Sequence, residues 1–172
     1  MIRVAVLFIS DEESTDKESA GSSSINEIIS GLLAKINGRK VYCSTVREDF
    51  RQIQEELFNV TEKGFADLVL TIGGTGLARK NVTPEATLAV VEKEVPGITE
   101  FMRMKTASKY PSVILSRGRA GIRKTSLIIN LPDVKEEVLE SLDCLAKIIP
   151  EGISVLRKDH DYYGYKELRL WN

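Results

Sequence analysis

The sequence predicts an α/β protein: a three-layer α/β/α sandwich with a mostly parallel sheet and one antiparallel hairpin strand. Apolar runs of strand length alternate with segments whose apolar residues recur at helical spacing. Those helical segments are long enough for the crossovers that join parallel strands. The sequence has no internal repeat, so we expect one domain over residues 1–156, followed by a C-terminal tail over 157–172.

The composition is that of a soluble globular protein. The 172 residues are 42% hydrophobic and 28% charged, and 24 basic residues nearly balance 25 acidic ones. Because the charges are interspersed and the net charge is -1, we expect no nucleic-acid partner and no anionic membrane surface. No apolar stretch has the length of a membrane span, and the N-terminus fits a first strand better than a signal peptide. A cytoplasmic location is therefore expected.

The cysteines and the histidine give no sign of a metal or redox site. Cys43 and Cys144 lie far apart in the sequence and belong to no CxxC or Cys/His group. We expect both to be reduced thiols in the core, without a disulfide framework or a zinc site. His160 is the only histidine and lies in a polar tail, where a catalytic role is not expected.

Start and stop signals delimit the elements of the N-terminal half. The first strand is a nearly continuous apolar run, as expected for a strand covered on both faces. A polar loop follows it, and serines then cap a helix that Asn37 and Gly38 end. Asp49 is placed to cap the next helix. The expected elements are strands over 2–9, 40–46 and 67–72, and helices over 24–36 and 49–64.

In the C-terminal half, proline residues mark several boundaries. Thr83, Pro84 and Glu85 read as the N-cap, first residue and first-turn acid of a helix. Pro132 and Asp133 start the last helix, and the tail after it has no clear periodicity. The expected elements are helices over 83–95, 98–108 and 132–150, and strands over 112–116 and 126–131 that form a hairpin around a basic turn at 117–124.

The third strand runs into a glycine-rich turn, Gly73-Gly74-Thr75-Gly76. Glycines accept positive φ, and they let backbone N–H groups approach a phosphate without interference from Cβ. The alternative is that the glycines only close the turn. In a parallel sheet, ligands bind beyond the carboxyl ends of the strands at a topological switch point, which is where this turn is expected.

Acidic residues follow the other strands that end at this edge. Ser10 and Asp11 come after the first strand, and Asp49 comes after the second. Either aspartate alone can be a simple cap, whereas their shared edge favours a joint role. The loop after the glycine turn adds Arg79 and Lys80.

A further group of candidate residues lies near the predicted hairpin. Ser116, Arg117 and Gly121 offer a hydroxyl, a guanidinium suited to phosphate and a flexible turn. The basic residues that follow are expected to be solvated charges, because hairpin turns are exposed. They are Arg119, Arg123 and Lys124.

These residues resemble the molybdopterin adenylyltransferase family, which includes the G domain of gephyrin and its plant counterpart. The resemblance spans residues 2–156. Its most specific part is LVLTIGGTGLARKNVTPEATLAV at 68–90, whose TPEAT form looks closer to the adenylyltransferases than to MoaB or CinA-like domains. The other matches are ISD at 9–11, V-x-x-D ending at Asp49, ILSRGRAG at 114–121 and LIINLP at 127–132.

The resemblance implies transfer of AMP from Mg-ATP to the terminal phosphate of molybdopterin, with release of pyrophosphate. It assigns catalysis to Asp49 and to position 81, and Mg²⁺ binding to Asp49. It also implies a homotrimer and a downstream molybdenum insertion protein as partner. The substrate- and nucleotide-binding positions that it implies are Ser10, Asp11, Gly73, Gly74, Thr75, Gly76, Thr83, Pro84, Glu85, Ser116, Arg117, Gly121, Asn130 and Pro132.

Two residues depart from the family pattern. The family carries an aspartate before V-T-P, where this chain has Asn81, and a glycine in LPG, where this chain has Asp133. An amide keeps the size but lacks the negative charge, so catalysis is slowed, absent, or supported by another acid. Asp133 repels ligand, caps the last helix or replaces the charge. The alternative function is therefore a catalytically weak or inactive MoaB-like molybdopterin-binding protein.

Overall fold

The computed structural model describes the backbone of residues 1–10, 20–62 and 64–167, with side chains described over 1–10, 23–62 and 64–158. Asp11, one of the predicted site residues, lies outside these ranges. The elements in chain order are β1 (Ile2–Ser10), α1 (Ala20–Lys35), β2 (Gly38–Arg47), α2 (Phe50–Glu62), β3 (Leu68–Ile72), α3 (Thr83–Leu88), β4 (Lys93–Glu94), α4 (Pro96–Ala107), the 3₁₀ helix η1 (Pro111–Leu115), β5 (Ala120–Arg123), β6 (Ser126–Leu131), α5 (Lys135–Leu145) and α6 (Ile149–Glu167).

The described strands form one sheet in the order β2-β1-β3-β6-β5-β4. Strands β2, β1, β3 and β6 are parallel, whereas β5 and β4 are antiparallel to their neighbours. The chain leaves β1 for β2 on one side and later returns to β3 on the other, so the topological switch point lies between β1 and β3. In the register there, Phe8 pairs with Ile72, which pairs with Leu131. The carboxyl ends of three strands therefore meet at one edge.

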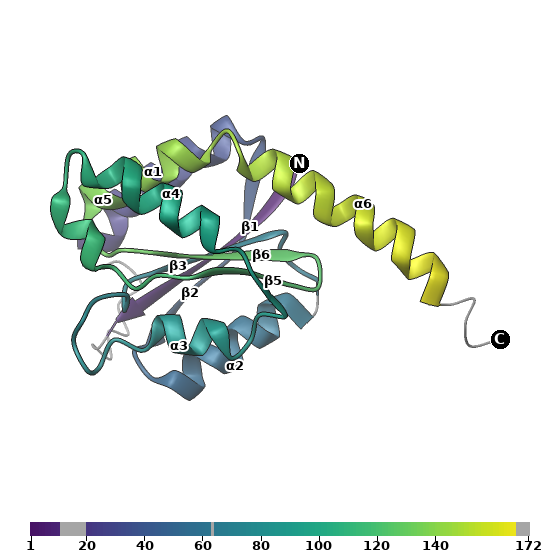
Figure 1. Cartoon of the computed structure of the whole chain (residues 1–172), viewed down its shortest axis with the longest axis horizontal. Helices are drawn as coiled ribbons and strands as arrows, with labels where there is room; N and C mark the ends of the chain where they lie inside the picture. The colour runs from purple at the N-terminus through teal and green to yellow at the C-terminus, as the bar shows by residue number, and fades with distance from the viewer. Residues whose placement is uncertain (11–19, 63, 168–172) are drawn as a thin grey trace.

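The sheet is the middle of three layers (Figure 1). Helices α1, α4 and α5 lie on one face, and α2 and α3 lie on the other. Side chains of β3 alternate between the two cores: Leu68, Leu70 and Ile72 pack with the first group of helices, and Val69 packs with the second. All five residues of β3 are buried, as expected for a central strand. The predicted three-layer fold with a mostly parallel sheet is confirmed.

The hairpin uses other residues than the sequence predicted. The strand expected over 112–116 is wrong: Pro111–Leu115 is a 3₁₀ helix, which proline at its start favours. Val113 is buried, while Ile114 and Leu115 are exposed. Instead, β5 pairs with β6 in the antiparallel hairpin, within the segment expected to be a basic turn, and Lys124 has positive φ in the turn between them.

The helix expected over 83–95 ends early, at Leu88. The backbone after it pairs with β5: the N–H of Glu92 donates to the Ile122 carbonyl and that of Val95 to the Ala120 carbonyl, each at 2.8 Å. This pairing makes β4 an edge strand. Helical spacing of Leu88 and Val91 alone could not reveal this competing strand partner.

The C-terminal region contains two helices where the sequence predicted one. Helix α5 begins at Lys135, after Val134 at its N-cap position, so Pro132 and Asp133 do not start it. Helix α6 begins at Ile149 and continues to Glu167, beyond the expected end of the last helix. The boundary predicted at residue 156 falls within α6 and stays a prediction.

The prediction that both cysteines are core thiols is wrong for Cys43. Cys43 is exposed because β2 is the edge strand of the sheet. Cys144 is half-buried on α5, and burial raises the pKa of its thiol to about 11. Both are free cysteines, as expected.

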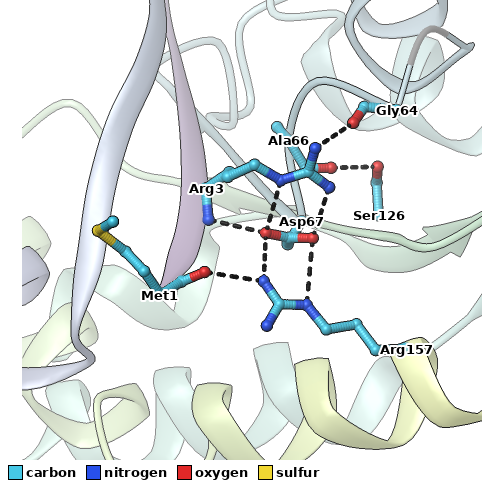
Figure 2. Close-up of polar contacts among 7 residues, drawn as sticks. All are labelled: Met1, Arg3, Gly64, Ala66, Asp67, Ser126 and Arg157. Carbon is cyan, nitrogen blue, oxygen red and sulfur yellow. Dashed lines mark hydrogen bonds and ion pairs between the residues drawn. The ribbon is translucent and has the colours of Figure 1, made fainter.

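A buried carboxylate ties the chain together at the amino-end edge of the parallel strands (Figure 2). The Asp67 side chain is only 2% exposed. It accepts a hydrogen bond from the backbone N–H of Arg3 at 2.7 Å, and further hydrogen bonds from the guanidinium group of Arg3 and from that of Arg157. Arg157 also donates to the Met1 carbonyl at 2.9 Å. This cluster, Arg3-Asp67-Arg157, joins β1, the start of β3 and α6.

The electrostatics of the cluster favour an ionised Asp67. Burial opposes the charge, but the hydrogen bonds from Arg3 and Arg157 outweigh it and hold the pKa of Asp67 well below its usual range. Because the folded pKa is lower than the unfolded one, the cluster stabilises the fold above pH about 4. This contribution declines as the pH falls below that value.

We predict that Asp67→Asn lowers the free energy of unfolding by about 1–3 kcal/mol at pH 7, because two guanidinium groups lose their anionic acceptor. Urea unfolding at pH 7 and at pH 3 measures this, and the gap to wild type should narrow at pH 3. The control is Asp143→Asn, which removes an exposed ion pair with Lys35 and should change stability by less than about 0.5 kcal/mol. A stability difference between wild type and Asp67→Asn that is the same at both pH values would contradict the ionised state of Asp67.

Candidate functional site

Gly73 follows β3 directly and fits between two neighbouring strands. Its N–H donates to the Leu131 carbonyl at 3.1 Å, and its φ is +104°. A Cβ at this position would lie 2.8 Å from the Ile9 carbonyl oxygen. A side chain would therefore collide with the backbone of β1, and glycine is required for the chain to leave the sheet here.

Gly74 is equally constrained, by side chains. Its φ is +67°, and a Cβ would lie 2.1 Å from Thr83 Oγ1 and 2.8 Å from Glu48 Oε1. The Gly74 carbonyl accepts from the Thr83 N–H at 3.2 Å. The explanation that glycines close the turn is therefore supported at these two positions. Phosphate binding by the turn stays a prediction.

The turn also presents backbone donors. Gly74 and Thr75 are buried and Gly76 is half-buried, yet their N–H groups donate no hydrogen bond to any described residue. Successive N–H groups of this kind, in a turn with positive φ, form a concavity that suits an anion. The geometry is thus compatible with phosphate binding by the predicted turn.

Arg117 holds the turn in place. Its Nε donates to the Gly76 carbonyl at 2.9 Å, and its Nη2 donates to the Asn81 carbonyl at 2.6 Å. Its third nitrogen makes an ion pair with Glu85. The sequence predicts that this guanidinium meets phosphate, whereas in this structure it is hydrogen-bonded to the glycine turn and to the loop that follows it. Ser116 lies beside it, with its hydroxyl 3.3 Å from Thr75 Oγ1.

Two acids follow β2, and sequence reasoning identified only one of them. Asp49 is exposed and caps α2, accepting from the N–H groups of Arg51 and Gln52 at 3.0 Å each. Its predicted capping role is confirmed. The missed residue is Glu48, which accepts a hydrogen bond from Asn81 Nδ2 at 2.6 Å. The only available signal was its position next to Asp49 after a strand.

Thr83 contributes a buried hydroxyl. It is fully buried, and Oγ1 has no hydrogen-bond partner among the described residues. Its predicted N-cap role is wrong: Val82 occupies the N-cap position of α3, Thr83 is the first helical residue, and no side chain caps the helix. Pro84 follows it and is buried, while Glu85 is exposed in the first turn. A buried hydroxyl without a partner is costly unless a ligand or water supplies one.

Two other predicted site residues serve packing and internal hydrogen bonding. Asn130 is fully buried, and its Nδ2 donates to the hydroxyls of Thr71 and Thr87 at 2.8 Å while its Oδ1 accepts from the Arg119 N–H at 3.0 Å. Gly121 lies inside β5, not in a flexible turn, and a Cβ there would be 2.7 Å from Val91. Asn130 is therefore needed for hydrogen bonds that fix β6, and Gly121 for the close packing of β5 against Val91.

The remaining predicted residues lie near the ends of strands. Ser10 is the last residue of β1, and its carbonyl accepts from the Glu48 N–H at 3.1 Å. Pro132 follows β6 and is buried, and Asp133 is exposed beside it. Asp133 therefore lies near this edge of the sheet but does not cap α5.

A polar groove of about 350 Å³ is lined in part by Arg117, the residue that is hydrogen-bonded to the turn. Arg103, Arg117 and Arg119 line it, together with Ser116 and Glu85. Arg103 donates to the Gly118 carbonyl at 3.2 Å, and Arg119 lies 3.7 Å from Glu94. Three guanidinium groups beside a turn with available N–H groups make this edge suited to a polyanionic ligand.

Among the side chains described over 1–10, 23–62 and 64–158, no group of three or more His, Cys, Asp or Glu is arranged to hold a metal ion. Within the described backbone, residues 1–10, 20–62 and 64–167, none of the helices combines the length and apolar character needed to cross a bilayer.

The fold and the site together define an α/β domain whose glycine-rich turn lies at the topological switch point of a mostly parallel sheet, beside side chains suited to a polyanion. Residues 5–151 match the family described as "Probable molybdopterin binding domain". The chain belongs to this family. The predicted resemblance is thereby confirmed.

Relatives of similar length carry a more specific name. A Helicobacter pylori protein named "Molybdopterin adenylyltransferase" is 37% identical over 171 residues, covering 99% of this chain and 96% of that protein. An Escherichia coli protein of the same name is 34% identical over 157 residues, covering 88% of this chain and 80% of its own length.

Solved structures share the fold. The molybdopterin biosynthesis enzyme MoaB from Thermus thermophilus is 34% identical, with a TM-score of 0.81 over 91% of this chain and 96% of that one. The molybdopterin biosynthesis Mog protein from Mycobacterium ulcerans is 26% identical, with a TM-score of 0.81 over 91% of this chain and 99% of that one.

We predict that Gly74→Ala destabilises the protein by about 1–3 kcal/mol, because the new Cβ meets the Thr83 hydroxyl at a backbone angle that alanine disfavours. Thermal unfolding measures the effect. The matched control is Gly97→Ala, since a Cβ at Gly97 has open space around it. Equal stability of the two variants would contradict the tight fit at Gly74.

Proposed function

We propose that this protein transfers AMP from ATP to the terminal phosphate of molybdopterin, which activates the pterin for molybdate insertion. The observation that carries this proposal is the match over 99% of the chain to a protein named molybdopterin adenylyltransferase. The site agrees with it chemically, because the turn, the hydroxyls and the arginine-lined groove suit phosphate groups on two substrates.

The reaction requires little acid–base chemistry. An oxygen of the molybdopterin phosphate attacks the α-phosphorus of ATP, a new P–O–P link forms, and pyrophosphate departs with the electrons of the broken bond. The attacking oxygen is already anionic, so the protein mainly aligns the two phosphates and offsets their charge. The proposed donors are the N–H groups of Gly74, Thr75 and Gly76 and the Ser116 hydroxyl.

Magnesium is proposed to enter with ATP. The described residues hold no three-acid cage, and Mg²⁺ at nucleotide sites needs none, because it keeps waters and takes phosphate oxygens with one or two carboxylates. Asp49 and Glu48 offer such carboxylates at the same edge. When bound, the ion would neutralise phosphate charge as it builds up. Asp49 remains the proposed ligand, through whichever oxygen the α2 cap leaves available.

The other predicted site residues divide between contact and support. Ser10, Asp11, Thr83, Pro84, Glu85 and Pro132 are proposed to border the substrates. Arg117 is proposed to keep the turn in its binding shape, since its hydrogen bonds run to the Gly76 and Asn81 carbonyls. Asn130 and Gly121 are proposed to support the strands beneath.

We further propose that the protein works in the cytoplasm as a homotrimer and delivers its product to a molybdenum insertion protein. The family resemblance is what supports the trimer and the downstream partner. The alternative function, a molybdopterin-binding protein without transfer activity, was motivated by Asn81. It is not favoured, because relatives from two genera bear the name of the transferase.

Incubation of the purified protein with molybdopterin, Mg²⁺ and ATP should yield adenylyl-molybdopterin and pyrophosphate in equal amounts, because one bond is exchanged for another. Chromatography with mass detection measures the first product, and a coupled assay measures the second. Reactions without protein or with AMP in place of ATP are the controls. Molybdopterin binding without either product would favour the non-catalytic alternative and contradict the proposal.

A further inference from the structure

The side chain at position 81 is paired with a carboxylate. Asn81 Nδ2 donates to Glu48 Oε1 at 2.6 Å, across a separation of 33 residues in the sequence. A carboxylate accepts hydrogen bonds and cannot donate one when ionised. An aspartate at position 81 would therefore repel Glu48, whereas the amide binds it. The amide at 81 and the acid at 48 are chemically matched.

The pair borders the glycine turn on the side of the buried Thr83 hydroxyl. The position of a Cβ on Gly74 would lie 2.8 Å from Glu48 Oε1 and 2.1 Å from Thr83 Oγ1. The position of a Cβ on Gly76 would lie 2.8 Å from Asn81 Oδ1. A carboxylate oxygen, an amide oxygen and a hydroxyl without a described partner thus converge on one turn. All three are hard oxygen atoms.

The backbone of Glu48 is also fixed by a hydrogen bond. Its N–H donates to the Ser10 carbonyl at 3.1 Å, at the carboxyl end of β1, and its side chain is half-buried. The next residue, Asp49, is exposed at the start of α2. The acid is therefore fixed at the switch point of the sheet, where the substrate phosphates are proposed to bind.

We propose that Glu48 supplies the carboxylate charge that position 81 lacks, and that Asn81 is the positioning residue that holds this carboxylate beside the glycine turn. The ligand of the Glu48 carboxylate is the divalent cation carried by the triphosphate of ATP. This inference rests on the proposed function, and it deepens it by naming the acid of the site. The pair has the same total charge as an aspartate at 81 beside a neutral residue at 48.

A purely structural role for the pair makes a different prediction. If the hydrogen bond only pins the loop, Glu48→Gln should be harmless, because a glutamine oxygen still accepts from the Asn81 amide. If the charge matters, the same substitution should impair cation-dependent binding although the loop stays in place. An exchange of the two groups, Glu48→Gln with Asn81→Asp, should restore both the charge and the hydrogen bond.

The experiment compares wild type, Glu48→Gln, Asn81→Asp and the exchanged double variant. Calorimetry measures the affinity for an ATP analogue with a methylene bridge between the α- and β-phosphorus atoms, with and without Mg²⁺. We expect Mg²⁺ to strengthen binding to wild type, and Glu48→Gln to lose this gain by about tenfold or more. If the two positions are coupled, the exchanged double variant should bind the analogue in the presence of Mg²⁺ with an affinity within about threefold of wild type.

Turnover gives a second readout. Glu48→Gln should lower kcat for AMP transfer by about tenfold or more, with a smaller change in KM for molybdopterin. Glu55→Gln, which neutralises an exposed glutamate on α2, is the matched control and should leave both readouts unchanged. Circular dichroism and thermal unfolding confirm that each variant is folded. Should the double variant not fold, the comparison of Glu48→Gln with Glu55→Gln decides.

The outcomes separate the two proposals. Wild-type transfer activity with no loss in Glu48→Gln would overturn the role of Glu48 and leave the proposed function intact. Absence of wild-type transfer, with Mg²⁺-dependent analogue binding that needs Glu48, would overturn the proposed function and support this inference. Analogue binding that Mg²⁺ does not affect, or a double variant no better than Glu48→Gln, would overturn the inference.

Discussion

The departure of the chain from β3 at Gly73 and Gly74 is the constraint on which the site depends. Strands β1, β3 and β6 end in register, so the chain must turn between the Ile9 carbonyl and the Leu131 carbonyl without a Cβ. The second glycine, Gly74, packs so closely against the Thr83 side chain that it has no room for a Cβ. Because the turn is this tight, Thr83 and Glu48 lie close to the Gly74 backbone. Arg117 closes the arrangement from the other side by holding the carbonyls of Gly76 and Asn81.

The two edges of the sheet use charge in opposite ways. At the amino-end edge, Asp67 is buried between Arg3 and Arg157, and its hydrogen-bonding capacity is satisfied by the protein. At the carboxyl-end edge, the Thr83 hydroxyl is buried without a described partner, and the turn offers N–H groups that no described residue accepts. The first arrangement stabilises the fold. The second leaves hydrogen bonds for a ligand to complete, which is the usual compromise between stability and function.

Local patterns predicted much of the fold and the location of the site. The apolar run of β1, the buried β3 and the Asp49 cap follow from periodicity and capping rules, and the switch-point rule then selects one edge of the sheet. Contacts between distant segments could not be predicted in this way. Pairing of residues 92–95 with β5 overrode the helical spacing before it, and the edge position of β2 exposed Cys43. The hydrogen bond from Asn81 to Glu48 depends on the loop conformation, so the sequence alone indicated a missing charge and not the residue beside it.

Nuclear magnetic resonance of the amide groups during a titration with Mg-ATP tests the central claim most directly, namely that the turn after β3 binds phosphate. The claim predicts large, saturable shifts for the N–H signals of Gly74, Thr75 and Gly76, because phosphate oxygens would become their acceptors. The signals of Gly31 and Gly97, which lie in α1 and α4, should move little. Saturable binding that shifts signals elsewhere and leaves the three turn amides unchanged would contradict the account.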